Sequence, residues 1–413
     1  MMNSDELQKL KAEVKQLAGC EPNTLHEESE RADDRDDECV DDDDLVSHGP
    51  RVAFDATIAP QDWERACNMR RDMPEKPRAL LVDDVVFDAH EPIGYHPERP
   101  ERLAAGRAAV AKAGARFETV TAREATAGEL ERVHDARFVA ALESLRGKKG
   151  MLDPDTYVSE RSIDAAMRAA GGSIAMVEGI LRGDAETGVA LLRPPGHHAR
   201  PSGAMGFCLI NNVAVAAAHA RASGVSRVAI VDFDVHHGNG TQEMFYAAPD
   251  VLYVSLHQFP FYPGTGAAEE IGEGKGTGYT VNVPLMAGGG DAVYRAAFDR
   301  IVSPVLEQYA PELVLVSAGF DAAARDPLAE MALTEAGYGA MTARLVAQAR
   351  KSARGRIALL LEGGYDLVAL ESGLSRSMSA MFDEAQPDAA AVANDSADVE
   401  RAARVIGEHW KLA

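Results

Sequence analysis

The chain has 413 residues, 46% hydrophobic and 26% charged, as in folded globular proteins and unlike disordered or fibrous ones. Its 42 Lys and Arg against 65 Asp and Glu give a net charge of −23, which argues against direct nucleic-acid or membrane-surface partners, since both bind basic surfaces. With four cysteines, no signal-peptide pattern and no apolar run of about 18 residues, we expect an intracellular protein, cytoplasmic or, in a eukaryote, nuclear, that does not span a membrane.

Residues 1–78 have the character of an extension to the folded body. Within 5–19, leucine and valine recur at spacings of three and four, which predicts a short amphipathic helix. Such a helix docks on the body or serves in oligomerisation, and we favour docking because isolated helices of this length are marginal in water. Residues 27–45 carry a dense acidic run that cannot bury enough apolar surface to order itself. We therefore expect an acidic, largely disordered tether, in preference to a recruiting element for a basic partner.

From residue 79 onward, apolar runs alternate with helical patterns. The predicted strands, each buried on both faces, are 79–87, 188–194, 227–234, 251–256, 313–321 and 356–364. The predicted helices lie near 99–114, 160–182, 211–223, 240–248, 291–309, 334–353 and 366–384. This alternation predicts a mostly parallel central sheet between two helix layers, an α/β protein of three-layer αβα architecture, with one domain over 79–413.

Polar residues follow four of these strands, at the carboxyl ends where open parallel sheets bind ligands. Asp234 and His236 are two residues apart, so in an extended segment they point to the same side, and Asp321 follows another strand. One nitrogen donor with carboxylate oxygens suits a catalytic zinc ion that keeps a position open for water. A lone Asp or His is more often a cap or a core residue, but the agreement of four strand ends favours a metal site.

The groups needed for hydrolysis stand at the same strand ends. Tandem His197 and His198, in a stiff Pro-Pro-Gly turn, could supply a base and an acid. Asp232 could fix the tautomer of one imidazole, and Asn239 could do so for the other without a charge. Tyr365 follows two glycines, where its hydroxyl could donate to a developing oxyanion. A structural turn and a packing tyrosine are the plainer alternatives; together, the residues predict metal-assisted hydrolysis of an amide.

Several motifs in order resemble the zinc-dependent histone deacetylase family, particularly its class II and bacterial deacetylase-like members, over about 79–385. The segments are YHPERPERL (95–103), RPPGHHA (193–199), GFCLINN (206–212), VDFDVHHGNGTQE (231–243), VSLHQFPFYPGTG (254–266), SAGFDAAARDPL (317–328) and LEGGYDL (361–367). The resemblance implies an arginase/deacetylase-like fold with a narrow tunnel above one zinc ion. The implied zinc ligands are Asp234, His236 and Asp321.

The resemblance also implies a role for each catalytic side chain. His198 is the implied general base and acid, and His197 is its electrostatic partner, hydrogen-bonded to Asp232. Tyr365 is implied to polarise the acetyl carbonyl. Some relatives with histidine at this position are weak deacetylases, so the tyrosine favours catalysis. Asn239 stands where class I members have aspartate, which fits class II.

Further expectations concern the tunnel and a second ion. Phe207, beside Gly206, and Tyr262 match the aromatic pair that encloses an acyl-lysine stem. Leu328 stands where polyamine-specific relatives place a glutamate, which disfavours a polyamine substrate, and Arg102 resembles the arginine of the acetate exit channel. A potassium ion is implied beside the zinc ion. Its implied ligands are Asp232, Ser255 and the backbone carbonyls of Asp234, His236 and Leu256.

The sequence therefore predicts a zinc-dependent amidohydrolase that removes acetyl or short acyl groups from lysine side chains of proteins. A deacetylase of a small acetylated amine such as an acetylpolyamine is the nearest alternative. A catalytically idle scaffold that binds acyl-lysine is another. An arginase-like hydrolase with two manganese ions would need further bridging carboxylates. The site would also accept other divalent ions, and an oligomer is possible.

Overall fold

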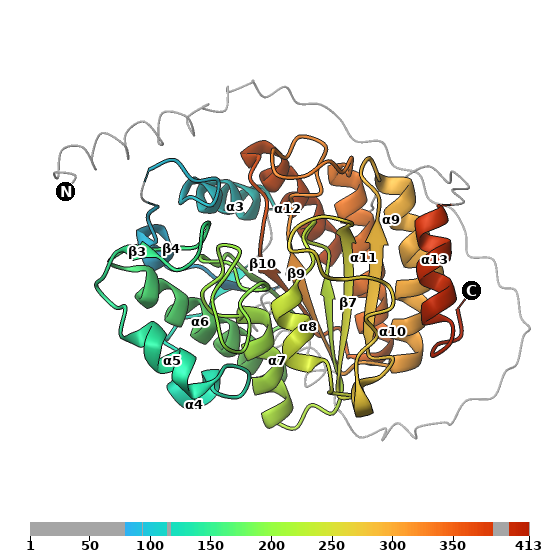
Figure 1. The fold of residues 1–413 in the computed structure, drawn as a ribbon, viewed down its shortest axis with the longest axis horizontal. Coiled ribbons are helices and arrows are strands. Elements are labelled where there is room, and N and C mark those ends of the chain that lie inside the picture. Colours follow the sequence, from blue (N-terminus) through green and yellow to red (C-terminus); the bar gives the residue numbers. More distant parts are fainter. Residues whose placement is uncertain (1–78, 93, 114–116, 383–395, 413) are drawn as a thin grey trace, which may run out of the picture. The chain divides into compact units, whose positions relative to one another are not determined.

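The computed structural model describes residues 79–92, 94–113, 117–382 and 396–412 (Figure 1). The predicted N-terminal helix and acidic tether lie outside these residues. The centre is an eight-stranded sheet, in the order β2-β1-β5-β10-β9-β6-β7-β8, in which every neighbouring pair is parallel. The strands of this sheet are β1 (Ala79–Val82), β2 (Phe117–Thr119), β5 (Thr187–Ala190), β6 (Val228–Asp232), β7 (Val251–Gln258), β8 (Thr280–Leu285), β9 (Leu313–Ala318) and β10 (Ile357–Leu361).

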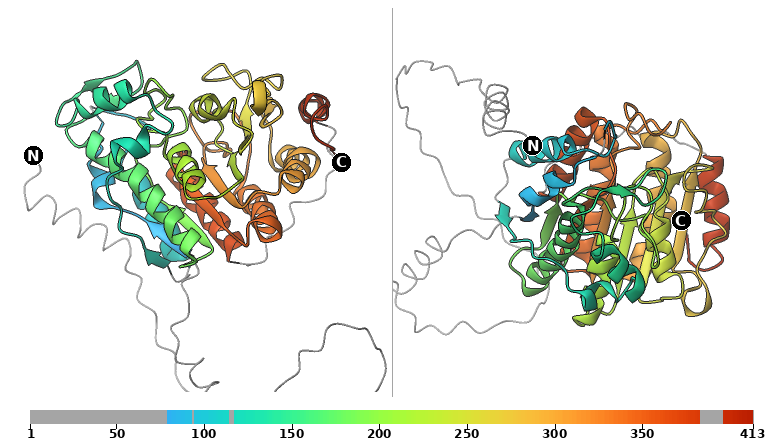
Figure 2. Two further views of the ribbon diagram at one scale, coloured as in Figure 1. Left: turned by 90° about the horizontal axis from the view of Figure 1, so that it is seen from below. Right: turned by 60° about the vertical axis from the view of Figure 1, so that its left-hand side comes forward.

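Helices cover both faces of the sheet, which confirms the α/β fold (Figure 1 and Figure 2). In one layer, α6 packs on β1 and β5, α7 on β6 and β9, and α8 on β7. Those helices are α6 (Ser162–Arg182), α7 (Asn212–Ala222) and α8 (Asn239–Phe245). In the other layer, α3 packs against α12, α12 against α11, and α11 against α9 and α10. Those helices are α3 (Glu101–Lys112), α9 (Asp291–Ala297), α10 (Ser303–Tyr309), α11 (Glu335–Ser352) and α12 (Leu367–Met381).

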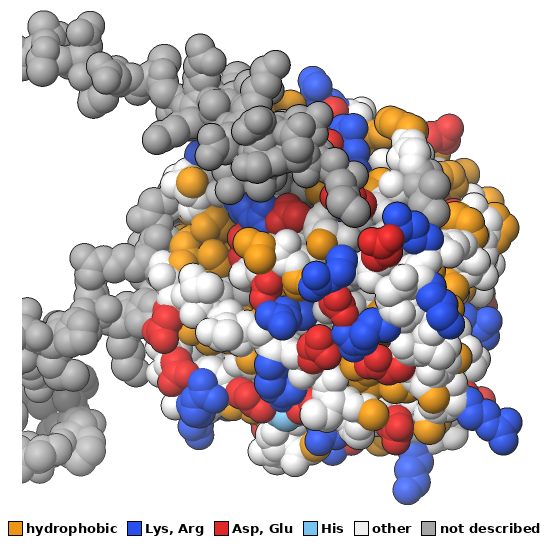
Figure 3. Space-filling view, turned by 90° about the vertical axis from the view of Figure 1, so that its left-hand side faces the viewer, with side chains coloured by type: hydrophobic (Ala, Val, Ile, Leu, Met, Phe, Trp, Pro, Cys, Tyr) orange, Lys and Arg blue, Asp and Glu red, His pale blue; other side chains and the backbone are white. Residues whose placement is uncertain are grey.

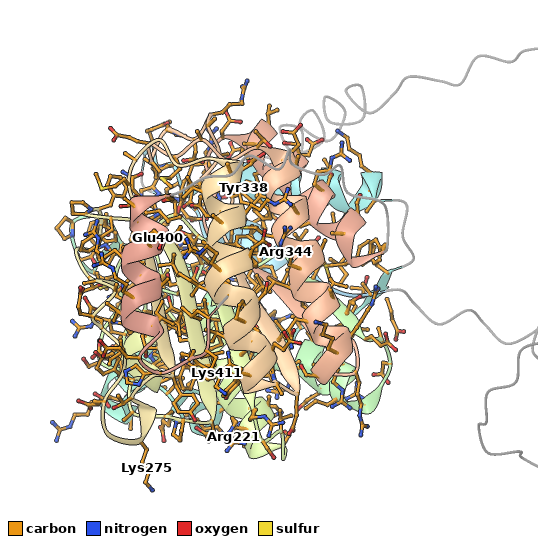
Figure 4. The ribbon with its side chains drawn as sticks, turned by 90° about the vertical axis from the view of Figure 1, so that its right-hand side faces the viewer. Arg221, Lys275, Tyr338, Arg344, Glu400 and Lys411 are labelled. Carbon is orange, nitrogen blue, oxygen red and sulfur yellow. The ribbon has the colours of Figure 1, made fainter. Side chains whose placement is uncertain are left out.

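Shorter elements complete the described part. They are η1 (Val85–Ala89), α4 (Ala127–Leu130), α5 (Ala136–Glu143), the antiparallel pair β3 (Gly150–Met151) and β4 (Tyr157–Val158), η2 (Gly274–Gly276), the π-helical turn η3 (Phe298–Val302) and α13 (Ala397–Ile406). Helix α13 packs against β8 and α9; Figure 4 shows this side, with Glu400 of α13 and Arg344 of α11 labelled. Among the residues described, none of the helices is both long and apolar enough to cross a bilayer.

The six predicted strands are present, and all residues of β5, β6, β7, β9 and β10 are buried, whereas Leu81 of β1 is half-buried. The strands predicted over 188–194, 313–321 and 356–364 end at least three residues earlier than expected. The strand predicted over 79–87 is too long, because the chain turns at Asp84, whose Oδ1 accepts a hydrogen bond from the Val86 N–H at 2.9 Å and caps η1. The helix predicted over 291–309 is divided by η3. The edge strands β2 and β8 are additions, since neither has a long enough apolar run to predict it.

On the face in Figure 3, Lys and Arg side chains lie among Asp and Glu side chains. Oppositely charged side chains at the surface also form ion pairs, for example Lys149 Nζ with a carboxylate oxygen of Glu160 at 3.3 Å. A continuous basic stripe, the usual footprint of nucleic-acid binding, is not seen on that face.

Candidate active site

The predicted metal ligands meet at the carboxyl edge of the sheet. Strands β6 and β9 are neighbours, so the loop that carries Asp234 and His236 lies beside the loop that carries Asp321. The Nδ1 atom of His236 is 3.3 Å from an oxygen of Asp234 and 3.2 Å from an oxygen of Asp321. The ligand atoms of all three residues lie within 4.8 Å of one another. They are the one His/Cys/Asp/Glu group with metal-binding spacing among the residues that the structure describes.

The backbone orients both carboxylates. The Gly363 N–H donates to Asp234 Oδ2 at 2.8 Å, and the Val235 N–H donates to Asp321 Oδ1 at 2.9 Å. One oxygen of each carboxylate is thereby held, and the other faces His236. A side chain at Gly363 would not fit, because its Cβ would lie 2.2 Å from Asp321 Oδ2.

This donor set fits a divalent metal ion. Two carboxylates and one imidazole are ligand types that divalent metals such as zinc accept, and a set of three protein ligands leaves a coordination position for water or substrate. Both carboxylates are buried, and burial together with the charge of Asp234 raises the pKa of Asp321. A bound cation would offset that repulsion between buried carboxylates.

Buried aromatic side chains hold the loops that carry Asp234, His236 and Asp321 against the core. Phe233 and Phe320, each next to a ligand residue, are fully buried with ring centroids 6.1 Å apart. Tyr338 of α11 packs on both, at 5.8 and 5.0 Å (Figure 4). Along 232–236 the apolar residues enter the core while the polar residues face the site, the alternation expected of an extended segment.

The tandem histidines have different partners. Asp232 Oδ2 lies 3.1 Å from His197 Nδ1, and Asn239 Oδ1 lies 2.9 Å from His198 Nδ1. Burial opposes a charge on His197, but the carboxylates of Asp234 and Asp232 raise its pKa to about 10. Burial and the neighbouring histidines His197 and His236 lower the pKa of His198 well below its ordinary value. These opposite pKa shifts favour the protonated form of His197 and the neutral form of His198.

Glu362 supports the histidine turn, a role that the sequence analysis missed. Its Oε2 accepts hydrogen bonds from the N–H groups of Gly196, at 2.6 Å, and His197, at 3.2 Å. Its Oε1 lies 3.2 Å from the Ser317 hydroxyl. The available signal was its position, a charged residue directly after the buried strand β10.

A buried ionic cluster connects the turn that carries His197 and His198 with the turn that carries Tyr365. Arg102, on α3, donates to the carbonyl oxygens of Gly364, at 2.7 Å, and Glu362. Glu98 accepts from Arg102 at 3.1 Å and from Nη2 of Arg193 at 2.8 Å. Glu98, Arg102 and Arg193 are all fully buried. The sequence analysis missed Glu98 and Arg193, although an arginine ending an apolar strand was a usable signal.

The predicted tunnel residues line one cavity of about 190 Å³. Its walls consist of Asp155, His198, Gly206, Phe207, His236, Phe261, Tyr262, Leu328 and Tyr365. Phe207 lies edge-on to Tyr365 with centroids 5.9 Å apart, and Tyr262 lies edge-on to His198 at 5.2 Å. The cavity therefore joins His198 and Tyr365, the predicted catalytic side chains, to the predicted tunnel residues. Phe261, which stacks on His236 at 5.6 Å, and Asp155 were not predicted.

Three of the expected potassium ligands lie at the carboxyl ends of the neighbouring strands β6 and β7. Asp232 and Ser255 are paired across β6 and β7, and both are buried. The Ser255 hydroxyl lies 2.9 Å from His257 Nδ1. Leu256 follows Ser255 on β7. These are oxygen donors of the kind that alkali cations accept.

The parallel sheet, its helix layers and the site at its carboxyl edge define the class: a three-layer α/β protein of arginase/deacetylase type. Residues 96–381 match the histone deacetylase domain. The chain is 42% identical over 295 residues to a probable deacetylase of Archaeoglobus fulgidus, covering 70% of this chain and 82% of that one. It is 44% identical over 277 residues to a histone deacetylase-like amidohydrolase of Pseudomonas aeruginosa, covering 65% and 72%.

A plant relative and a solved structure agree. Histone deacetylase 15 of Arabidopsis thaliana is 45% identical over 297 residues, covering 70% of this chain and 53% of that protein. The crystal structure of the HDA15 HD domain superposes with a TM-score of 0.75 at 40% identity, covering 81% of this chain and 96% of that one. The chain belongs to the histone deacetylase family, and the family supports a hydrolase activity of the deacetylase type.

Proposed function

We propose that the protein is a zinc-dependent lysine deacetylase that removes acetyl or short acyl groups from lysine side chains of proteins. One observation carries the proposal: His198, Tyr365 and the metal ligand His236 line the same cavity as Phe207 and Tyr262. Flat apolar walls suit the aliphatic stem of lysine, and the reactive groups stand beside them. A stem enclosed there carries its acyl group toward His198 and Tyr365.

The zinc ion would be held by Asp234, His236 and Asp321, and when bound it would polarise the acyl carbonyl and activate a water molecule. His198 takes the proton from the attacking water. Its Nδ1 atom is bonded to Asn239, so Nε2 is the proton acceptor. The same nitrogen then protonates the leaving lysine amine as the C–N bond breaks, which yields a carboxylic acid and the free amine.

Two further groups stabilise the negative charge that develops on the carbonyl oxygen. Tyr365 donates its hydroxyl proton in a hydrogen bond to that oxygen. Burial is the main cause that raises the pKa of Tyr365 well above its ordinary value, so the hydroxyl stays protonated at neutral pH. His197, kept cationic by Asp232, adds positive charge nearby. A potassium ion bound by Asp232 and Ser255 would belong to the same proposal.

A small acetylated amine is the second candidate substrate. Asp155 places a carboxylate on the cavity wall, where it would attract a cationic amine as well as a basic peptide. The apolar Leu328 at the same cavity offers no second charge partner, so we rank protein lysine first.

The test is hydrolysis of an acetyl-lysine peptide and an acetylpolyamine side by side. Purified protein is assayed as isolated, after chelation, and after zinc restoration, with Tyr365→Phe as the catalytic variant. Peptide turnover that disappears on chelation, returns with zinc and falls in Tyr365→Phe supports the proposal. Turnover of the polyamine alone would favour the small-amine enzyme. Binding of acyl-lysine peptide without turnover of either substrate would favour the idle scaffold.

A further inference from the structure

A buried carboxylate outside the residues assigned above joins two walls of the cavity. Asp326 lies in the loop after β9 and is 6% exposed. Its Oδ2 accepts hydrogen bonds from the N–H groups of Tyr365, at 2.6 Å, and Asp366, at 3.1 Å. Its Oδ1 accepts from the N–H group of Leu328 at 3.0 Å. One side chain therefore holds the backbone of two cavity-lining residues, Tyr365 and Leu328.

The segment that carries Tyr365 depends on such outside contacts for its conformation. Two glycines precede the tyrosine, and Gly364 has a φ of +120°, which makes the local backbone permissive. Arg102 holds the carbonyl oxygens of Glu362 and Gly364. Asp326 holds the next two N–H groups along the chain. A cation and an anion thus fix the carbonyl groups and the N–H groups of the same turn.

A carboxylate at this position is costly for folding. Burial and the nearby charge of Asp321 raise the pKa of Asp326 to about 7, against the effect of the three N–H donors. A hydrophobic residue would avoid that desolvation cost. In its ionised form, which prevails above that pH, Asp326 provides acceptor capacity, because a carboxylate has lone pairs for all three donors and no proton of its own.

We propose that Asp326 is a positioning residue for Tyr365, and that it sets the tyrosine hydroxyl relative to the acyl carbonyl while fixing Leu328 at the cavity wall. The inference rests on the proposed function, because it assumes that Tyr365 acts on the carbonyl. Asp326 itself does not line the cavity, so it acts through the residues it holds.

The test variant is Asp326→Asn. The amide keeps the shape but has one acceptor oxygen where the carboxylate has two, so an NH₂ group faces either the Leu328 N–H or the N–H groups of Tyr365 and Asp366 and pushes that cavity-lining segment away. A displacement of about 1 Å at a catalytic group can cost about 100-fold in rate, so we expect kcat to fall by about that factor. KM should change by less than about fivefold, since the aromatic walls that bind the stem remain. If Asp326→Asn does not fold, the test uses Asp326→Ser, whose side chain is smaller and still contains a hydrogen-bond acceptor.

The matched control is Asp366→Asn, one residue beyond Tyr365. Asp366 caps α12 by accepting from the Ala369 N–H at 2.8 Å, and asparagine caps equally well. This variant loses an exposed ion pair with Arg325, at 3.3 Å, and keeps the Asp326 contacts. We expect kcat within twofold of the parent protein.

A double-mutant cycle separates positioning from general structural damage. If Asp326 acts through the Tyr365 hydroxyl, Asp326→Asn should cost less than about threefold in a Tyr365→Phe background. An equal loss in both backgrounds would overturn the inference. Hydrogen–deuterium exchange gives a readout that needs no activity: the amides of 364–366 should exchange faster in Asp326→Asn and not in Asp366→Asn. If the parent protein hydrolyses no acylated substrate, the proposed function fails; unchanged exchange at 364–366 would refute the positioning claim separately.

Discussion

Replacement of Glu98 by glutamine should destabilise the protein far more than the same change at the surface. Glu98 is fully buried between Arg102 and Arg193, and Glu98→Gln leaves two guanidinium groups without a counter-charge. Removal of one partner from a buried ion pair costs about 3–5 kcal/mol. Both arginines keep carbonyl partners, such as the Phe87 oxygen 2.8 Å from Arg193, so we expect a value within that range.

The matched surface variant is Glu371→Gln, because Glu371 pairs with the exposed Lys112. Exposed pairs contribute about 0–1 kcal/mol, so the two variants should differ by at least about 2 kcal/mol. Urea denaturation followed by circular dichroism measures both free energies of unfolding, with zinc present throughout. Equal losses for the two variants would refute the view that Glu98 neutralises a buried cationic cluster.

Acidification gives the same reasoning a second check. Burial works against ionisation of Glu98, but the charge and hydrogen bonds of Arg193 hold its pKa well below its usual range. A lowered pKa contributes stability that is complete above the unfolded value of about 4.3 and is lost as the pH falls toward the folded value. The stability difference between the parent protein and Glu98→Gln should therefore be constant from pH 7 to about pH 5 and shrink below about pH 4. A difference that persists unchanged in strong acid would contradict this.

Three other variants test the site. Asn239→Asp puts a carboxylate 2.9 Å from His198, the proposed general base, which favours its protonated form, so the acid limb of kcat/KM should move up by at least about one pH unit; an unmoved limb argues against His198 as the base. In Gly319→Ala the new Cβ would lie 2.1 Å from an oxygen of Asp234, so zinc content by atomic absorption should collapse, while Gly128→Ala, with open space around it, should retain it. Leu328→Glu gives a cationic polyamine a charge partner at the cavity wall and should raise the acetylpolyamine-to-peptide ratio of kcat/KM by about tenfold, which corresponds to about 1.4 kcal/mol; an unchanged ratio would remove Leu328 from substrate selection.

The central strands were predictable because they are buried on both faces, so each one appears in the sequence as a short run of apolar residues. The segment at 313–318 is a continuous apolar run, and all six residues are buried. The strand order was not predictable from the sequence. Strand β10 lies between β5 and β9 in the sheet, although β5 is separated from both of them by more than 100 residues of sequence. Non-local pairing of this kind depends on packing of whole elements and leaves no local mark. Short elements such as β2 were missed for a related reason: three residues are too few to show a period.

Predicted metal-binding residues are easier to recognise in the sequence than the residues that position a site from behind. Asp234 and His236 stand out because charged groups directly after a buried strand need a reason to be there. Glu98 and Asp326 lie in loops rich in other polar residues, where a carboxylate is unremarkable until its buried partners are known. Both prove to be almost wholly buried, and each holds a turn that carries a catalytic side chain.

Glu98 and Asp326 support the two neighbouring turns that carry the histidines and Tyr365. Glu98 binds Arg193, which precedes the histidine turn, and Arg102, which holds the carbonyl oxygens before Tyr365. Asp326 holds the N–H group of Tyr365 itself. The tyrosine and the histidines come from strands β10 and β5, which are adjacent in the sheet, so the sheet sets their separation coarsely. The ionic contacts add what the sheet does not provide, namely the orientation of the two turns, which proton transfer and hydrogen bonding to a carbonyl oxygen require to within a fraction of an ångström.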